Sequence, residues 1–142
     1  LNNSMKKILS NSKLFVAAVV LCVIGFAGVL SSCNVSTANL SEVKVCSSLN
    51  GSECSNDVSS FPGDVPAIYC SASLNNAPAD TKVTFEWKQE GVSIGKAELN
   101  AESGFVNSTF KPTSTLEPGK YSVSVKLATD NSTPITKEFT IE

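Results

Sequence analysis

Two segments of this 142-residue chain alternate apolar and polar residues so regularly that they favour one local structure. Along residues 82–89 the apolar side chains are Val83, Phe85 and Trp87, with polar residues between them, and residues 120–129 repeat the pattern. Successive side chains of a β-strand point to opposite faces, so a period of two predicts strands with one buried face. We therefore expect an all-β protein with an apolar core beneath these strands.

The same rhythm of short apolar segments, divided by Gly, Pro, Asn and Asp, continues from residue 42 to the last residue. Several short strands with turn residues between them are typical of a β-sandwich or barrel. The apolar spacing of an amphipathic helix, at i, i+3, i+4 and i+7, does not occur in this region. The predicted strands are 42–47, 67–73, 82–89, 92–99, 105–111, 120–129 and 135–141.

The N-terminal segment has the layout of a secretory signal, in which basic residues precede an apolar run and small residues. Lysines precede an uncharged run over residues 14–30, and Ser31 and Ser32 follow it. Residues 1–4 come before the single Met of the chain, and we treat them as upstream sequence outside the fold. An uncleaved anchor is an alternative, because a run of this length is at the short end of what spans a bilayer.

The end of this run, Leu30-Ser31-Ser32-Cys33, resembles the lipobox of bacterial lipoproteins. In that family the chain is cut just before the cysteine, which carries lipid such as diacylglycerol and palmitate. The resemblance implies a protein that hangs from a membrane by lipid on Cys33. The implied organisation is a signal peptide at 1–32, a lipidated N-terminus and tether at 33–41, and a folded domain at 42–142.

Charge and composition exclude several classes of function. From Cys33 onward the chain has eight lysines and no arginine against thirteen acidic residues, so its net charge is −5. An acidic chain without arginine argues against binding of nucleic acid. The chain has no histidine, which excludes Ser-His-Asp and Cys-His catalysis and histidine metal sites. We therefore expect no enzymatic activity, no metal site and no cofactor.

Acidic residues and glycines show no spacing that would hold a cation or a phosphate. Asp57, Asp64 and Asp80 fall in predicted loops, outside any calcium-binding pattern. We expect each of these side chains to form turn hydrogen bonds with its own backbone.

Three cysteines, Cys46, Cys54 and Cys70, fall in the predicted domain, so at least one is not paired within the chain. Three intramolecular pairings are possible. We favour Cys46 with Cys54, because they flank the turn-forming pair Asn50-Gly51 and an exported domain lies where disulfides persist. The spacing differs from the Cys-x-x-Cys of redox-active pairs, which favours a structural role.

Cys70, Trp87 and Tyr121 lie at positions that resemble the immunoglobulin fold. In that fold a Trp on the third strand packs against an inter-sheet disulfide, and a Tyr at the start of the sixth forms the tyrosine corner. Val123 stands where the second cysteine of an antibody domain would lie, so the resemblance is to fibronectin type III and bacterial Ig-like accessory domains. The resemblance implies a seven-stranded Ig-like sandwich over 42–142, with Cys70 as a buried thiol.

Two aromatic residues, Tyr69 and Phe105, are out of phase with their core-facing neighbours and form the candidate binding surface. The segment 47–65 is the best candidate for a binding loop. These features predict a non-enzymatic, lipid-anchored cell-envelope protein that faces the periplasm or the exterior and presents an Ig-like binding or structural module. The alternative is an inhibitor or accessory subunit of an envelope enzyme or complex. The expected partners are the membrane, through Cys33, and an envelope protein.

Overall fold

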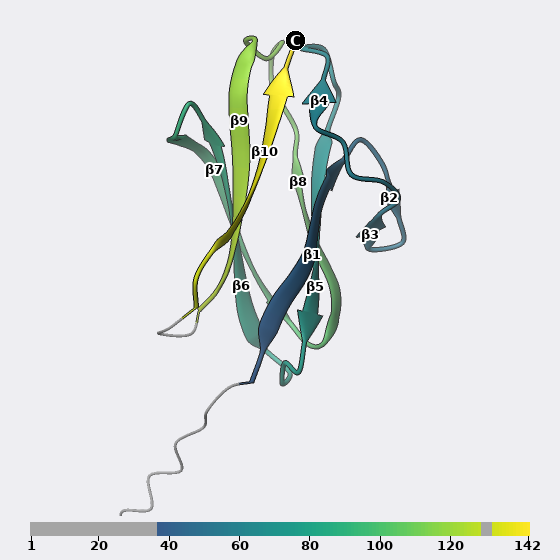
Figure 1. The fold of residues 1–142 in the computed structure, drawn as a ribbon, viewed down its shortest axis with the longest axis vertical. Coiled ribbons are helices and arrows are strands. Elements are labelled where there is room, and N and C mark those ends of the chain that lie inside the picture. The colour runs from purple at the N-terminus through teal and green to yellow at the C-terminus, as the bar shows by residue number, and fades with distance from the viewer. Residues whose placement is uncertain (1–36, 129–131) are drawn as a thin grey trace, which may run out of the picture. The chain divides into compact units, whose positions relative to one another are not determined.

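The computed structural model describes residues 37–128 and 132–142, whose regular structure is entirely β (Figure 1). The prediction of an all-β protein is confirmed. Among these residues no helix is long and apolar enough to cross a membrane. The longer strands are β1 (Asn39–Cys46), β5 (Ile68–Asn75), β6 (Thr81–Gln89), β7 (Val92–Ala101), β8 (Gly104–Phe110), β9 (Gly119–Leu127) and β10 (Ile135–Ile141). Three two-residue strands are β2 (Leu49–Asn50), β3 (Glu53–Cys54) and β4 (Ser60–Phe61).

Two sheets lie face to face and enclose the core between them (Figure 1). The smaller sheet has the strand order β1-β5-β8, and the larger has the order β4-β10-β9-β6-β7. Neighbouring strands are antiparallel throughout, except that β4 runs parallel to β10. The strands β2 and β3 form a separate antiparallel hairpin between β1 and β4 in the sequence.

The inner face of the larger sheet is built by the alternation seen in the sequence. Val83, Phe85 and Trp87 point inward from β6 and are at most 3% exposed. They lie beside β9, where Val125 opposes Phe85 and Val123 opposes Trp87. Burial of such side chains is worth about 1.5–3 kcal/mol each, which makes this strand pair the centre of the core.

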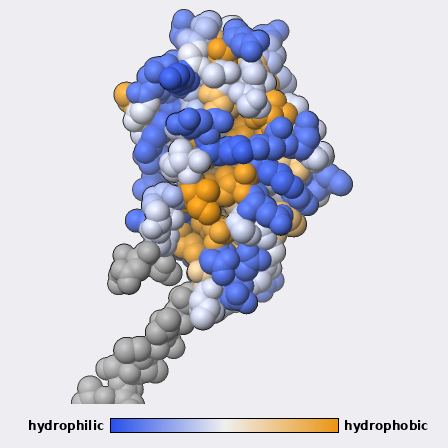
Figure 2. Space-filling view, in the orientation of Figure 1, coloured by the Kyte–Doolittle hydropathy of each residue, from blue (hydrophilic) through white to orange (hydrophobic). Residues whose placement is uncertain are grey.

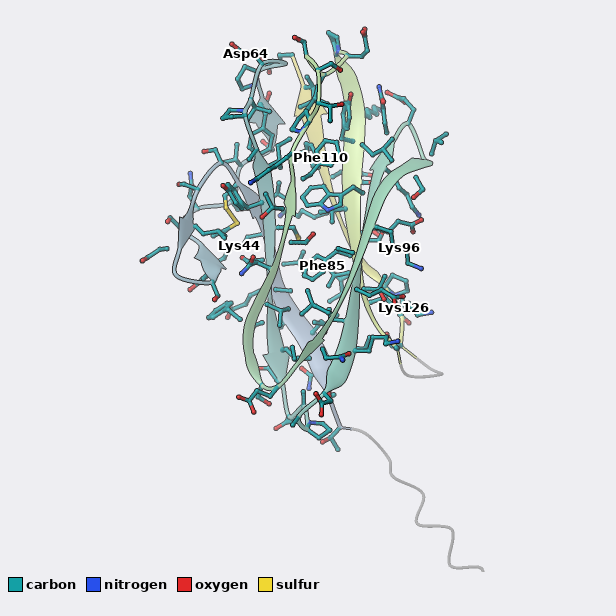
Figure 3. The ribbon with its side chains drawn as sticks, turned by 180° about the vertical axis from the view of Figure 1, so that it is seen from behind. Lys44, Asp64, Phe85, Lys96, Phe110 and Lys126 are labelled. Atoms are coloured by element: carbon teal, nitrogen blue, oxygen red, sulfur yellow. A yellow bond between two sulfur atoms is a disulfide. The ribbon has the colours of Figure 1, made fainter. Side chains whose placement is uncertain are left out.

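The opposite faces of the sheets carry polar side chains. Viewed from behind, Phe85 and Phe110 point into the space between the sheets, whereas Lys96 and Lys126 lie outside the larger sheet (Figure 3). Cys70 points into the core from β5 and is a buried free thiol, as predicted. The period of two in the sequence therefore assigned these side chains to the correct faces.

The seven predicted strands correspond to the seven longer strands, with each end placed within three residues. The largest difference is at β1, which begins at Asn39, inside the segment expected as a tether. There Asn39 pairs with Asn75 of β5, Leu40 packs against the core, and a bulge follows between Ser41 and Lys44. A bulge adds a residue and shifts the alternation, so the sequence period did not reveal the start of this strand.

The segment 47–65, expected as a loop, contains β2, β3 and β4. A two-residue strand carries no period of its own, so the alternation of apolar residues could not indicate these elements. The pairing of β4 also depends on a distant part of the chain, because Thr140 N donates to Ser59 O at 2.9 Å, and Glu142 N donates to Phe61 O at 3.0 Å. The predicted signal peptide and Cys33 lie outside the described residues.

One edge of the sandwich, between β1 and β10, leaves apolar side chains partly uncovered. Figure 2 shows them as a hydrophobic area in the middle of this face, crossed by a hydrophilic band. Leu40, Val43 and Val58 pack against the core at this edge and are partly buried. The carboxylate of Asp57 bridges the edge, because it accepts hydrogen bonds from the Val45 N–H, at 3.1 Å, and from the Lys137 ammonium.

Candidate binding site: a disulfide-stapled hairpin

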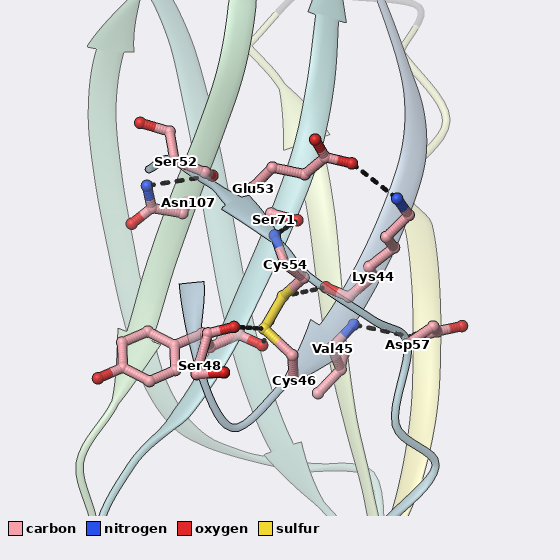
Figure 4. Close-up of a disulfide and its surroundings, with 11 residues drawn as sticks. Lys44, Val45, Cys46, Ser48, Ser52, Glu53, Cys54, Asp57, Ser71 and Asn107 are labelled. Atoms are coloured by element: carbon pink, nitrogen blue, oxygen red, sulfur yellow. Dashed lines mark hydrogen bonds and ion pairs between the residues drawn. A yellow bond between two sulfur atoms is a disulfide. The ribbon is translucent and has the colours of Figure 1, made fainter. Parts of the chain in front are cut away.

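The hairpin formed by β2 and β3 lies on the outside of the smaller sheet (Figures 1 and 4). Two residues, Gly51 and Ser52, join its strands, and Leu49 pairs with Cys54. Gly51 has a φ of 65°, which L-residues rarely adopt, and its Cα faces open space. Glycine in the first position of a two-residue loop is typical of a type II′ turn. The sequence signal Asn50-Gly51 therefore marked this turn correctly.

A disulfide holds the base of this hairpin against the sheet. Cys46, the last residue of β1, is bonded to Cys54 of β3, with their Cα atoms 5.7 Å apart. The predicted pairing of these two cysteines is present in the structure. The N–H of Cys54 also donates a buried hydrogen bond of 2.9 Å to the hydroxyl of Ser71 on β5 (Figure 4). One covalent and one polar contact thus fix β3 above the middle strand of the smaller sheet.

Two further contacts hold the exposed part of the hairpin. The Lys44 ammonium lies 2.7 Å from the carboxylate of Glu53, and the Asn107 amide donates to the carbonyl of Ser52 at 3.5 Å. The hydrogen bond to Glu53 raises the pKa of Lys44 above its ordinary value, because the carboxylate stabilises the ammonium form. Strands β1, β5 and β8 therefore each contribute a residue that positions the hairpin.

Asp57 has a role different from the one expected. The sequence predicted a side chain that bonds its own backbone, but this carboxylate instead binds the Val45 N–H and the Lys137 ammonium. The correction has a physical reason: the chain after β3 turns back across the open edge, where a carboxylate is the group that satisfies both donors. Asp57 thereby fixes the chain that leads away from the hairpin.

The surface that the hairpin presents is polar and carries little charge. Its exposed side chains are hydroxyls and amides, on either side of a rigid turn. Ser, Gly and Asn are enriched in binding loops of the antibody type together with Tyr, and they supply adaptable hydrogen bonding there. A loop that is already ordered loses little conformational entropy on binding. The exposed residues are Ser47, Ser48, Asn50, Gly51, Ser52, Ser55 and Asn56.

The two aromatic residues predicted to form a binding surface are on the same face but do not meet. Tyr69 is partly buried at the base of the hairpin, where its backbone pairs with Cys46, whereas Phe105 is 38% exposed. Tyr69 pairs with Thr109 of β8. Thr109 lies four residues along that strand from Phe105, so Tyr69 and Phe105 are about 13 Å apart. The two residues therefore lie apart on this face, because strand register separates residues that share a phase. A binding role for either residue stays a prediction.

The buried polar groups nearby are engaged in structure. Trp87 is core, as predicted, and its indole N–H donates to the Ser108 hydroxyl at 3.2 Å. Burial raises the pKa of the Cys70 thiol to about 12, so it stays protonated and unreactive at neutral pH. No three His, Cys, Asp or Glu side chains come close enough to hold a metal ion within 37–128 and 132–142.

The sequence analysis did not single out the residues that hold the hairpin in place, which are Lys44, Glu53, Ser71 and Asn107. Ser71 is fully buried on the outer face of β5, in a phase that the sequence marks as exposed, because the hairpin covers it. Glu53 lies in β3, whose pairing the sequence did not reveal. The site was nevertheless located by the loop expected over 47–65, by the turn-forming pair Asn50-Gly51 and by the two cysteines. The cysteines were informative because a short disulfide loop must fold back on itself.

Comparison with known proteins identifies no family for this chain. No protein-family model matches the chain, and no curated protein matches it. One solved structure that matches the chain is the superoxide reductase (neelaredoxin) from Ignicoccus hospitalis. Its TM-score is 0.41, and its sequence is 14% identical. The match covers 82% of this chain and 88% of that one. At this level it supports no inference of a shared activity.

The match nevertheless corrects one expectation. The lack of histidine and of cofactor motifs was taken to mean that the chain is not an enzyme, yet the matching structure bears the name of an enzyme. The conclusion drawn from composition therefore does not stand. Whether this chain catalyses a reaction is not established.

Proposed function

We propose that this chain is a lipid-anchored protein of the bacterial cell envelope. Its Ig-like domain would bind an envelope protein through the stapled hairpin. The observation that carries this proposal is the hairpin itself: a polar turn that a disulfide, a buried hydrogen bond and an ion pair hold in one place. Rigid scaffolds commonly carry their binding residues on such loops. The lipobox-like sequence ending at Cys33 supports the anchor.

The strand order supports the Ig-like part of the proposal. In Ig domains, one sheet contains the first, second and fifth strands, and the other contains the third, sixth and seventh. The seven longer strands follow this scheme, since β1, β5 and β8 form one sheet and β6, β9 and β10 the other. The strand β7 extends the second sheet beside β6, as the fourth strand does in fibronectin type III domains.

Individual side chains support the same reading. The Tyr121 hydroxyl donates to the carbonyl of Glu117 at 2.9 Å, which is the hydrogen bond of a tyrosine corner. Trp87 lies in the core on the third of the longer strands, with its ring stacked on Phe110 at a centroid distance of 5.6 Å. Val123 lies opposite Trp87, where an antibody domain would have the second cysteine of its bridge.

The hairpin is tested by photo-crosslinking in membranes. A photoreactive amino acid at Ser52, on the exposed turn, is expected to link the protein to one specific partner. The matched control is Ser114, which is also an exposed loop serine and lies between β8 and β9; at this position we expect no such link. Equal yields at both positions, or no partner at Ser52, would contradict the assignment. A captured enzyme whose activity changes on binding would favour the alternative, an inhibitor or accessory subunit.

The anchor is tested separately by changing cysteines at the N-terminus. We expect Cys33→Ser to abolish lipidation, so the intact mass loses its diacylglyceryl adduct and the mature lipoprotein disappears from the membrane fraction. The control is Cys22→Ser, within the apolar run, which should leave both mass and location unchanged. A wild-type protein that keeps its complete N-terminal segment without lipid would instead show an uncleaved anchor.

A further inference from the structure

The strand β7 is a long edge with unused hydrogen-bonding groups. It is ten residues long and, in the part of the chain that the structure describes, has a paired neighbour on one side alone. Edge strands present a row of backbone N–H and C=O groups that can pair with another chain. Of the three large apolar residues that are exposed within 37–128 and 132–142, Val92 and Ile94 lie on this strand. This edge is therefore a candidate for addition of a further strand.

The pairing of β7 with β6 determines which face each side chain occupies. Lys96 lies opposite Glu86 and Glu98 opposite Thr84, so both charged residues point away from the core. Ala97, between them, lies opposite the buried Phe85 and faces the core side. The edge thus presents the opposite charges of Lys96 and Glu98 on its outer face. The small residue between them, Ala97, lies on the inner face.

We propose that a second copy of this chain pairs with β7, with the two β7 strands antiparallel and Ala97 opposite Ala97. In that register Lys96 of each copy lies opposite Glu98 of the other, so a two-fold axis generates two cross-strand ion pairs. Opposite charges placed directly across an antiparallel pair are attractive, and a two-fold interface uses the same surface of both partners. The strand is therefore complementary to itself.

Neighbouring registers are disfavoured by the same charges. A shift of two residues in one direction places Lys96 opposite Lys96, and a shift in the other direction places Glu98 opposite Glu98. Like charges directly opposite each other are destabilising. The pairing of β7 with β6 has a bulge between Trp87 and Lys88, opposite the part of β7 that precedes Gly95. A bulge bends the strand, so regular pairing of β7 with another chain is limited to its central part.

The charges are available for this contact. Lys96 and Glu98 are 59% and 48% exposed, and their own ion pair is long, at 3.7 Å. Lys82 also approaches Glu98, at 3.8 Å. Such loose surface pairs contribute little to folding, so the side chains can turn toward a partner strand at little cost. This inference does not depend on the proposed function of the hairpin.

The register is tested by disulfide crosslinking of the full-length protein in detergent. Two opposed Ala97 positions would have Cα atoms about 4.5–5.5 Å apart, within the reach of a disulfide. We expect Ala97→Cys to give a disulfide-linked species of doubled mass under mild oxidation. The control is Ala101→Cys on the same face of the same strand, where two copies lie about 26 Å apart in this register. Absence of the Ala97→Cys dimer, or equal dimer from both variants, would overturn the proposal.

The charge complementarity is tested by reversal. Lys96→Glu or Glu98→Lys alone makes both cross-strand contacts repulsive, and we expect each to weaken self-association about tenfold or more. A mixture of the two single variants restores both attractive contacts, as does the double variant Lys96→Glu/Glu98→Lys, so dimers should return. Circular dichroism confirms that each variant is folded. Dimers that are unaffected by the single changes, or a mixture that fails to recover, would refute this interface.

Discussion

Replacement of Trp87 by alanine is expected to lower the free energy of unfolding by about 3–5 kcal/mol, the usual cost of removing a large buried aromatic side chain. The indole is 3% exposed, stacks on Phe110 and meets the edge of Phe139 at a centroid distance of 6.3 Å. Its loss leaves a cavity at the point where the two sheets meet. Urea denaturation followed by circular dichroism measures the change, since the variant lacks the single tryptophan of the chain.

Two further variants separate packing from general disturbance. Trp87→Phe keeps an aromatic ring but leaves the buried Ser108 hydroxyl without its donor, and an unsatisfied group of this kind costs about 1–3 kcal/mol. Lys88→Ala, one residue later on the outer face, removes a surface ion pair with Glu86 and should cost at most about 1 kcal/mol. If Lys88→Ala is as destabilising as Trp87→Ala, the core assignment is wrong. Trp87→Phe still tests it should the alanine variant fail to fold.

Trp87 illustrates what could be predicted from the sequence. Its phase with Val83 and Phe85 is a local property, because alternation along a single strand requires no knowledge of neighbouring strands. The same local reasoning located all seven longer strands. Turn residues were similarly informative, because Gly51 adopts a positive φ that few other residues tolerate.

The positions that the sequence did not reveal depend on pairing between distant segments. Tyr69 and Phe105 have the same phase, but their separation depends on the register between β5 and β8. Asp57 resembles any loop aspartate until β10 brings Lys137 beside it. Ser71 is buried because a hairpin that is seventeen residues away in the sequence, at Cys54, covers it. These properties follow from tertiary contacts, and the periodicity of the sequence carries no information about such contacts.

The candidate site was therefore found through its covalent bond and not through its surface. Two cysteines flanking a turn predicted a fold-back, and that prediction required no long-range information. The contacts that give the hairpin its direction, from Lys44, Ser71 and Asn107, come from three different strands. A sequence can indicate that a loop is closed by a disulfide. The sheet beneath the loop determines which face of the domain the loop covers.

Removal of the disulfide by Cys46→Ala/Cys54→Ala is expected to lower the free energy of unfolding by about 2–3 kcal/mol, because the closed loop is short. The largest local effect should appear in the hairpin. Without the bond, the hairpin is held to the sheet by the Ser71 hydrogen bond, by the Lys44–Glu53 ion pair and by the contact of Asn107 with Ser52. We expect faster amide hydrogen exchange across residues 47–56, while the strands of the larger sheet keep their relative protection.

Reduction provides the matched control for this variant. A reductant should destabilise the wild type by the same amount and leave the double variant unchanged, because Cys70 has no partner to lose. Cys70→Ala should keep the full response to reductant. Alkylation of the unfolded chain should modify one of these three cysteines without reductant and all three with it. A double variant as stable as the wild type, with unchanged exchange in the hairpin, would mean that the polar contacts alone hold this loop and that its rigidity does not come from the disulfide.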